Sequence, residues 1–547
     1  MKGKKMLAIC AVLVAAMLLS NANNISKKTL VKETHINKPP TPIPVSATPA
    51  DLQLQIKPTR ESFKRFYIPT DIQITLNEGA DQNPAITTDG SANILCLYEI
   101  ETDINQFDIG IGVSYDGGAN WPEGYYFEVD GNPEQPRLDF YEGKTAYGTW
   151  TADPIEAFGY AYYAEFPDIT DPEAGEYGWV YYRVGWGESY GIGAPFTSSD
   201  VACYAMATPP TPDFWGIVAF TGDNQYSGYE EDNAFMFQYA TEEGYVTIIF
   251  FYNMSVDVFN VSVDIDQSTG WCVMVADFID EKDPSVFGSY LLAKKITSSE
   301  DWWRGGWNGA KFKNCMHPYV DAKDGRFYIA TEFLNDDGST DIVCWTSSTP
   351  SNAASWKGYY VTETPGENER YPAVTAINAN ESTVLYTKDG NVYSAKTNDG
   401  GKTWEIEQVN DNPSTVYEGY GCLDVEGSYG VWTDTFNGNN DIFFDIVGRA
   451  AVLQLAISGG FGAKVKIANI GNAPAKNVKW SIDLEGKLVL IGKHKEGIIS
   501  EIQPGVSVTV STGLVLGIGK VNIKAKAGDA SATATAFLLG PFVLGVS

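Results

Sequence analysis

One turn that occurs twice constrains the fold of this chain more than any other feature. Its two copies are Ser114-Tyr115-Asp116-Gly117-Gly118-Ala119-Asn120-Trp121 and, much later, Thr397-Asn398-Asp399-Gly400-Gly401-Lys402-Thr403-Trp404. In each copy the Asp can bond its own backbone, the glycines can take positive φ, and the Trp begins the next strand. The repeat indicates a chain built from copies of one β unit.

Composition agrees with an all-β protein that has many turns. Aromatic residues make up 13% of the 547 residues, and the chain contains 54 glycines but few long apolar patterns of helical period. The length allows a large core and more than one domain.

A proline that precedes an alternating strand marks successive units. It occurs as Asn83-Pro84, Gln135-Pro136, His317-Pro318 and Tyr371-Pro372, at positions where the missing N–H of Pro costs least. Similar strand starts near Asp200, Asn260 and Tyr420 bring the number of units to seven, with six as the alternative. We expect residues 71–76 to supply the outer strand of the last unit and to close the ring.

The two turns resemble the Asp box, or BNR repeat, of sialidase-like β-propellers. The matching residues are Ser114, Asp116, Gly118 and Trp121 in the first copy, and Thr397, Asp399, Gly401 and Trp404 in the second. The resemblance implies a β-propeller over residues 65–449, with seven blades or, as the alternative, six.

The resemblance does not extend to the catalytic residues of sialidases. Those enzymes clamp a carboxylate with three arginines and use a Tyr–Glu pair as nucleophile, with an Asp as acid and base. Their early Phe/Tyr-Arg-Ile-Pro motif has its nearest counterpart in Arg65-Phe66-Tyr67-Ile68-Pro69, where Tyr67 replaces the Arg. This departure argues against sialidase activity, because a fold does not by itself confer a function.

The beginning of the chain predicts export. Lysines precede an apolar run and then small residues, so residues 1–22 have the order of a secretory signal peptide. Residues 23–64 are polar and then Pro-rich, which is typical of an extended spacer. We therefore expect a secreted or cell-surface-associated protein with no transmembrane helix beyond the signal segment.

Charge divides the remainder into two domains. Residues 51–449 carry 21 Lys and Arg against 63 Asp and Glu, whereas residues 450–547 carry 10 Lys against 5 acids. The acidic part excludes nucleic acid as a partner. Residues 450–547 alternate apolar and polar positions in short runs, which predicts an Ig-like β-sandwich after the propeller.

Residues at the starts of the innermost strands are the candidate ligand-binding residues, because such positions line the mouth of a propeller channel. These candidates are Asn83, Gln135, Arg137, His317, Tyr319, Arg370 and Tyr371. The structural alternative is that they cap strand ends and fill the channel with hydrogen bonds. The cluster Trp302-Trp303-Arg304-Gly305-Gly306-Trp307 suggests either stacking on sugar rings or packing between blades.

We expect no cofactor, with calcium as the alternative. Asp336, Asp337 and Asp341 offer oxygen ligands but lack the spacing of an EF-hand loop, so a hairpin turn explains them as well. The pattern predicts a propeller that binds an extracellular glycan or a surface protein without catalysis. The alternatives are an exo-acting, sialidase-like glycoside hydrolase and a structural component of the cell envelope. The sequence leaves the oligomeric state open.

Overall fold

The described residues are almost entirely β-strand. The computed structural model describes residues 50–52, 60–62 and 71–546 with short gaps, the longest being 181–195, 224–232 and 299–305. The predicted signal peptide, most of the predicted spacer, Tyr67, Trp302 and Trp303 lie outside this part. A short 3₁₀ helix occupies Ala353–Ser355, and no helix in the part described is long and apolar enough to cross a membrane. The prediction of an all-β protein is confirmed.

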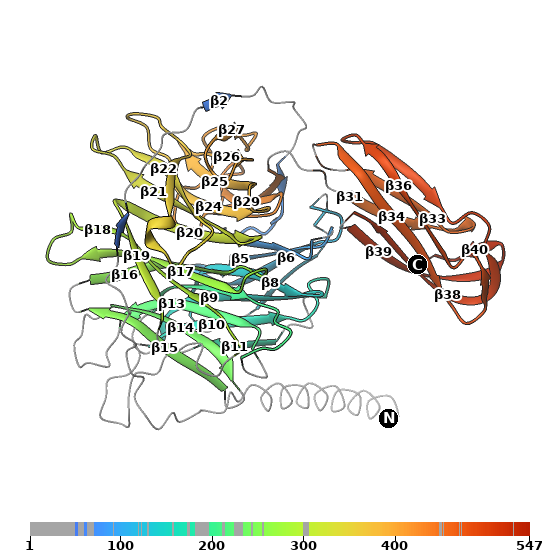
Figure 1. The fold of residues 1–547 in the computed structure, drawn as a ribbon, viewed down its shortest axis with the longest axis horizontal. Coiled ribbons are helices and arrows are strands. Elements are labelled where there is room, and N and C mark those ends of the chain that lie inside the picture. Colours follow the sequence, from blue (N-terminus) through green and yellow to red (C-terminus); the bar gives the residue numbers. More distant parts are fainter. Residues whose placement is uncertain are drawn as a thin grey trace, which may run out of the picture.

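Most of the described chain forms seven sheets that follow one another in sequence (Figure 1). The first two contain β4 (Asp81–Thr88), β5 (Ile94–Asp103), β6 (Gln106–Ser114) and β7 (Glu123–Phe127), then β8 (Pro133–Glu142), β9 (Thr145–Ile155), β10 (Phe158–Phe166) and β11 (Glu176–Val180). The third contains β12 (Phe196–Cys203), β13 (Gly216–Asp223), β14 (Asn233–Thr241) and β15 (Gly244–Asn253). Each is an antiparallel meander of neighbouring strands.

The later sheets repeat this order. The fourth and fifth contain β16 (Val256–Ile265), β17 (Trp271–Asp280), β18 (Phe287–Lys295) and β19 (Asn308–Lys313), then β20 (Cys315–Lys323), β21 (Arg326–Leu334), β22 (Thr340–Ser347) and β23 (Lys357–Tyr360). The last two contain β24 (Arg370–Ala376), β25 (Ser382–Lys388), β26 (Asn391–Thr397) and β27 (Trp404–Gln408), then β28 (Leu423–Glu426), β29 (Tyr429–Asp434) and β30 (Asp441–Ile446).

The seven sheets close into a ring. The first strand of each sheet lies beside the first strand of the next, and β28 of the last sheet lies beside β4 of the first. Apolar side chains fill the space between neighbouring sheets, as where Ile86 and Cys96 share a core with Val431 and Phe444 across the closure. Consecutive four-stranded meanders arranged around an axis are the architecture of a β-propeller.

Residues before the first complete sheet add strands at outer edges of the ring. β3 (Ile72–Gln73) pairs antiparallel with β30, so a segment from residues 71–76 completes the last sheet as expected. β1 (Ala50–Leu52) and β2 (Arg60–Ser62) pair parallel with β19 and β27. Strand pairing with the ring thus begins inside the segment predicted to be a spacer.

The C-terminal residues form two sheets of their own. One contains β31 (Leu453–Ser458), β33 (Lys464–Asn469) and β37 (Ser507–Ser511). The other contains β32 (Gly460–Phe461), β40 (Phe542–Leu544), β39 (Ala530–Gly540), β38 (Leu516–Ala527), β34 (Ala475–Glu485) and β36 (His494–Ile502), with β35 (Val489–Ile491) paired to β38. Val465, Ile467 and Ile482 belong to the single core between them. We call residues 453–546 the C-terminal module; Figure 1 shows it at one side of the ring.

Large aromatic side chains pack between neighbouring sheets of the ring. Phe312 of β19 lies 4.6 Å, between ring centroids, from Trp345 of β22, and Trp307 is fully buried. The packing interpretation therefore holds for Trp307. The six cysteines of the described residues are all buried and unbridged.

Candidate functional site

The starts of the first strands share an unusual backbone conformation. Asn83, Gln135, Asn260, His317 and Tyr371 have φ between 51° and 54°, and the register of each strand shifts at this point. A left-handed conformation is unfavourable for residues other than Gly. Its recurrence at five equivalent positions, each with a shift in strand register, shows that it is a regular part of the architecture. We call these five residues the inner rim.

Side chains of the second strands hold the inner rim in place. The backbone N–H of a rim residue donates to a carboxylate on the second strand of the preceding sheet, which joins the two sheets at the centre of the ring. The pairs are Gln135 with Glu99 Oε1 (2.8 Å), His317 with Asp277 Oδ2 (2.8 Å) and Tyr371 with Glu332 Oε1 (2.6 Å). At Asn83 the acceptor is the hydroxyl of Thr433 (3.1 Å).

Burial changes the protonation of these groups. It raises the pKa of Glu99 and of Asp277 to about 7, although several hydrogen bonds to each carboxylate oppose the shift. Burial by itself lowers the pKa of His317, but the hydrogen bond from its Nδ1 to Glu332 Oε1 (2.8 Å) and the charge of that carboxylate raise it overall. The imidazole is therefore more readily protonated than a free His.

Arg137 lies buried just inside the inner rim, with only 2% of its surface exposed. Its guanidinium carbon is 5.3 Å from the ring centroid of Tyr319 and 5.4 Å from that of Tyr420, distances at which cations bind aromatic faces. Burial by itself lowers the pKa of Arg137, but the two tyrosines and the carboxyls of Asp200 and Asp424 together raise it. Arg137 therefore stays charged at the centre of the ring.

Several polar atoms around Tyr420 and Gly421 have no hydrogen-bond partner of normal geometry in the described part of the chain. They are Asn83 Oδ1, Gln135 Oε1, Arg137 Nη1 and Tyr420 Oη. The Asn83 and Gln135 side chains both border Gly421, since a Cβ placed there would lie 3.7 Å from Asn83 Oδ1 and 3.6 Å from Gln135 Cγ. Arg137 and Tyr420 contact each other only outside that geometry; burial raises the pKa of Tyr420 to about 12, while the charge of Arg137 and its side-chain hydrogen bond to Tyr420 oppose the shift. Asn83 and Gln135 therefore border Gly421, and Arg137 borders the ring of the adjacent Tyr420.

Three aromatic rings border the same group. The His317 ring centroid lies 5.1 Å from that of Tyr371 and 5.4 Å from that of Tyr420. All three residues are only partly buried. Arg370 precedes Tyr371 in the chain, and its charge acts on His317.

A second layer of carboxyls lies deeper along the first strands. Asp139, Asp264, Asp321 and Glu426 influence one another electrostatically, and burial raises the pKa of each, that of Asp139 to about 7. Asp139 and Asp321 also accept backbone hydrogen bonds from Cys203 and Ala376 of the following sheets. This layer joins sheets below Arg137 as Glu99 and Asp277 do at the rim.

The structure brings all seven predicted site residues to the centre of the ring. Asn83, Gln135, His317 and Tyr371 lie on the inner rim, Arg370 precedes Tyr371, and Arg137 and Tyr319 lie one step inside. Tyr420 and the supporting acids Glu99, Asp277 and Glu332 are not among the residues that the sequence predicted for the site. The sequence spacing could have identified the acids, because each lies 15 to 17 residues after the rim residue of its own sheet.

The repeated turns have matching hydrogen bonds. In one copy Gly118 N donates to Ser114 Oγ (2.9 Å) and Trp121 Nε1 donates to Gly118 O (3.1 Å). In the other, Gly401 N donates to Thr397 Oγ1 (3.0 Å) and Trp404 Nε1 donates to Gly401 O (3.0 Å). Asp116 and Asp399 accept from the backbone N–H of Asn120 and Thr403. Both turns join the third and fourth strands of a sheet, far from the inner rim in sequence and topology, so they serve the fold.

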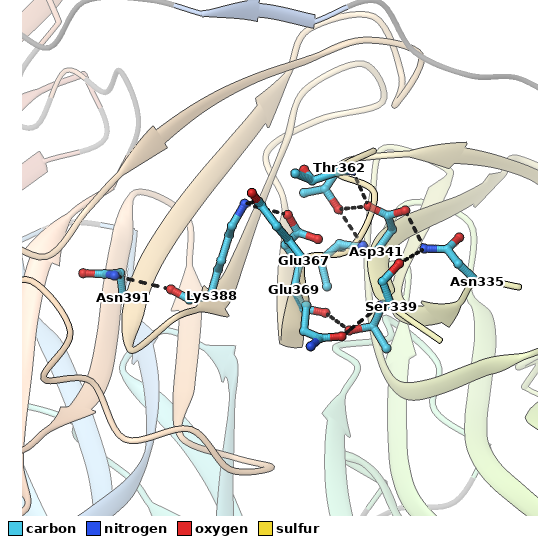
Figure 2. Close-up of polar contacts among 12 residues, drawn as sticks. Asn335, Ser339, Asp341, Thr362, Glu367, Glu369, Lys388 and Asn391 are labelled. Atoms are coloured by element: carbon cyan, nitrogen blue, oxygen red, sulfur yellow. Dashed lines mark hydrogen bonds and ion pairs between the residues drawn. The ribbon is translucent and has the colours of Figure 1, made fainter. Parts of the chain in front are cut away.

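Beside the acidic loop between β21 and β22, the carboxylate of Asp341 is engaged by hydrogen bonds within the protein (Figure 2). Asp341 is buried and accepts from Asn335 Nδ2 (2.8 Å), Thr362 Oγ1 (3.2 Å) and Thr364 N (2.9 Å). Asp337 accepts hydrogen bonds from the backbone N–H and the hydroxyl of Ser339, as in a hairpin turn. The role of Asp336 stays open. In the part of the chain that the structure describes, no group of three or more His, Cys, Asp or Glu could hold a metal ion. The calcium alternative stays a prediction.

A second network lies beside this loop. Lys388 Nζ pairs with Glu369 Oε1 (3.1 Å) and with Glu367, and the Glu369 side chain is fully buried. Thr340 Oγ1 donates to Glu369 O (3.0 Å), which links the loop to β24 (Figure 2). Glu367 and Glu369 are thus paired with the ammonium group of Lys388, which is consistent with a structural role for this network.

No family model and no curated protein matches the chain. Among solved structures, the β-propeller domain of the Trilobed protease from Pyrococcus furiosus is similar at 11% identity and a TM-score of 0.40, over 67% of this chain and 94% of that one. The Trypanosoma rangeli sialidase is similar at 9% identity and 0.36, over 78% and 89%. The Hadza microbial sialidase Hz136 is similar at 15% and 0.35, over 67% and 65%. The assignment of the ring as a propeller rests on its strand topology.

Proposed function

We propose that the centre of the ring binds the hydroxyl-rich end of an extracellular glycan without catalysis. The observation that carries the proposal is the pair of unpartnered amide oxygens Asn83 Oδ1 and Gln135 Oε1 beside Gly421, next to the guanidinium of Arg137 and the hydroxyl of Tyr420. Buried polar atoms in proteins normally have partners, so a group of this kind is suited to a ligand that supplies them. A sugar offers both donors to the amide oxygens and acceptors to Arg137 and Tyr420.

The aromatic border supports a sugar over other polar ligands. The faces of His317, Tyr371 and Tyr420 provide apolar area beside the hydrogen-bonding atoms, which suits the alternating polar and apolar faces of a sugar ring. In this proposal the seven sheets are seven blades, the two repeated turns are Asp boxes, the C-terminal module is Ig-like, and the protein acts outside the cell after export.

A glycoside hydrolase is the second candidate, because Glu99 and Asp277 have pKa values suited to proton transfer near neutral pH. Their surroundings favour binding instead. Glu99 is 3% exposed and accepts from Gln82 Nε2 (2.8 Å) and Asn83 Nδ2 (2.8 Å), in addition to Gln135 N. A carboxyl engaged in this way supports the rim and does not face a substrate.

The test incubates the chain with a mixed glycan library and identifies the retained and the chemically altered glycans by mass spectrometry. We expect retention without alteration, and roughly tenfold weaker binding for Tyr420→Phe, which removes one hydroxyl and leaves the ring. The matched control is Tyr417→Phe, a tyrosine three residues away that is 40% exposed.

Altered glycans would establish the hydrolase instead. Equal binding by Tyr420→Phe and Tyr417→Phe would show that the centre of the ring is not the binding site. No retained glycan at all would favour a protein ligand or a structural role in the cell envelope.

A further inference from the structure

The end of the C-terminal module that lies farthest from the ring carries an unusual set of exposed apolar side chains. At the near end of the module, Gln454 Nε2 donates to Asp116 O (3.3 Å) of the ring. β31 runs from there to Ser458, which pairs with Lys464 at the opposite end. Figure 1 shows β38 and β40 on the side of the module away from the ring. We call residues 459–464, 486–495, 512–520 and 537–544 the tip.

The four segments of the tip belong together in space. Gly462 N donates to Pro541 O (3.0 Å), and Thr512 N donates to Ala463 O (3.0 Å). Ile518 N donates to Leu488 O (3.1 Å). Segments from both sheets of the module therefore meet at one end.

One part of the apolar set is a patch on the outer face of a sheet. Ile518, Phe537, Leu539, Phe542 and Leu544 are each 44–53% exposed. They come from three neighbouring strands, and the register pairs Ile518 with Leu539, Leu539 with Phe542, and Phe537 with Leu544. The patch is therefore continuous across the strands and faces outward, where an alternating strand normally places polar residues.

The other part protrudes from the turns. Leu490 is 77% exposed, and Leu488, Ile491 and Leu514 are 51–55% exposed. Phe461, 50% exposed, contacts Phe542 edge to face with 6.2 Å between ring centroids and joins the turns to the patch. None of these side chains belongs to the buried core of the module.

Positive charge predominates at the tip. Its segments contain Lys464, Lys487, Lys493, Lys495 and Lys520, all exposed, whereas the acids beside it are Glu485 and Glu496, which adjoin its ranges, and Asp483, which pairs with His494. The ring carries a large negative charge, whereas residues 450–547 carry 10 Lys against 5 acids, and five of those lysines lie at the tip. Apolar side chains that protrude among lysines fit a surface that is anionic outside and apolar beneath.

We propose that the tip docks on an anionic lipid bilayer, with the leucines and phenylalanines among the acyl chains and the lysines at the headgroups. A second copy of the tip is a poorer fit, because it would place the same lysines against one another. This role is independent of glycan binding by the ring. Docking through the tip would hold the centre of the ring away from the membrane, with the C-terminal module as the spacer between them.

The test measures co-sedimentation of the full chain with vesicles of phosphatidylcholine alone and of phosphatidylcholine with phosphatidylglycerol. We expect binding to the anionic vesicles, weakened by salt. The double variant Leu490→Ser with Ile491→Ser should weaken it roughly tenfold or more, since the apolar contribution scales with the buried carbon atoms. The matched control is Ile498→Ser, a side chain that is 66% exposed on β36 of the same module.

A second pair of variants tests the charge. Lys487→Gln with Lys493→Gln should weaken binding to the anionic vesicles by about fivefold for each lysine. Lys476→Gln with Lys479→Gln, at the other end of β34, should leave it unchanged. The proposal is refuted by a chain that sediments with neither vesicle, by equal effects of tip and control variants, or by a dimer that the tip variants dissociate.

Discussion

The buried carboxyl of Glu99 gives the sharpest test of how the centre of the ring is built. Its pKa is about 7 in the folded protein against 4.5 ordinarily, with burial as the largest cause. The folded state then holds a proton that the unfolded chain releases. Stability from this group is fully present below pH 4.5 and is lost as the pH rises through about 7. At 1.36 kcal/mol per pKa unit, the loss by pH 8 is about 3 kcal/mol.

The perturbation is Glu99→Gln, which keeps the size of the side chain and removes its charge. Gln can still accept from Gln135 N and Asn83 Nδ2, but its new NH₂ group meets Gln82 Nε2, and the Gln82 oxygen is engaged by Asn440 Nδ2, so the variant carries a cost in stability that does not change with pH. Between about pH 4 and pH 8 we therefore expect the free energy of unfolding of the variant to fall by about 3 kcal/mol less than that of the parent protein. Urea unfolding followed by tryptophan fluorescence at each pH measures this difference.

The matched control is Glu101→Gln, two residues along the same strand. Glu101 accepts backbone hydrogen bonds from Ala80 and Asn105, and these lower its pKa. Its contribution is therefore lost as the pH falls, with the opposite sign to that of Glu99. The reasoning about Glu99 is refuted if Glu99→Gln and the parent protein lose stability in parallel as the pH rises.

Three further predictions concern the fold. Gly118→Ala should lower the unfolding free energy by about 2–4 kcal/mol in urea titration, because φ is +88° and a Cβ there would overlap the Phe444 ring. The control Gly438→Ala has a similar φ of +89° but open space around the Cβ, so it should lower the unfolding free energy by only about 1 kcal/mol. Equal costs would contradict the packing argument. Asp399→Ala removes the acceptor for Lys402 N (2.9 Å) and Thr403 N (3.0 Å), so differential scanning calorimetry should show a loss of about 1–3 kcal/mol, and an unchanged melting temperature would contradict it. Alkylation after unfolding without reductant should label all six described cysteines, and protection of a pair would reveal a bridge.

The sequence by itself determined the β units of the ring and their approximate positions. The repeated turns and the prolines of Asn83-Pro84 and Tyr371-Pro372 act locally, through positive φ and a missing N–H, so they are readable without the fold. The same prolines mark residues that lie near one another at the centre of the ring, because equivalent positions in repeated units meet at the axis of a ring; their role in binding stays a prediction.

Only the tertiary structure decided what surrounds those residues. Arg137 lies against Tyr319 of β20 and against Tyr420 in the turn before β28, both far away in the sequence. The raised pKa of Glu99 depends on burial, which is a property of the closed ring. The tip of the C-terminal module likewise exists only because two sheets end at the same place. Local rules determine strands and turns, whereas desolvation and the meeting of distant strands depend on how the whole chain is packed.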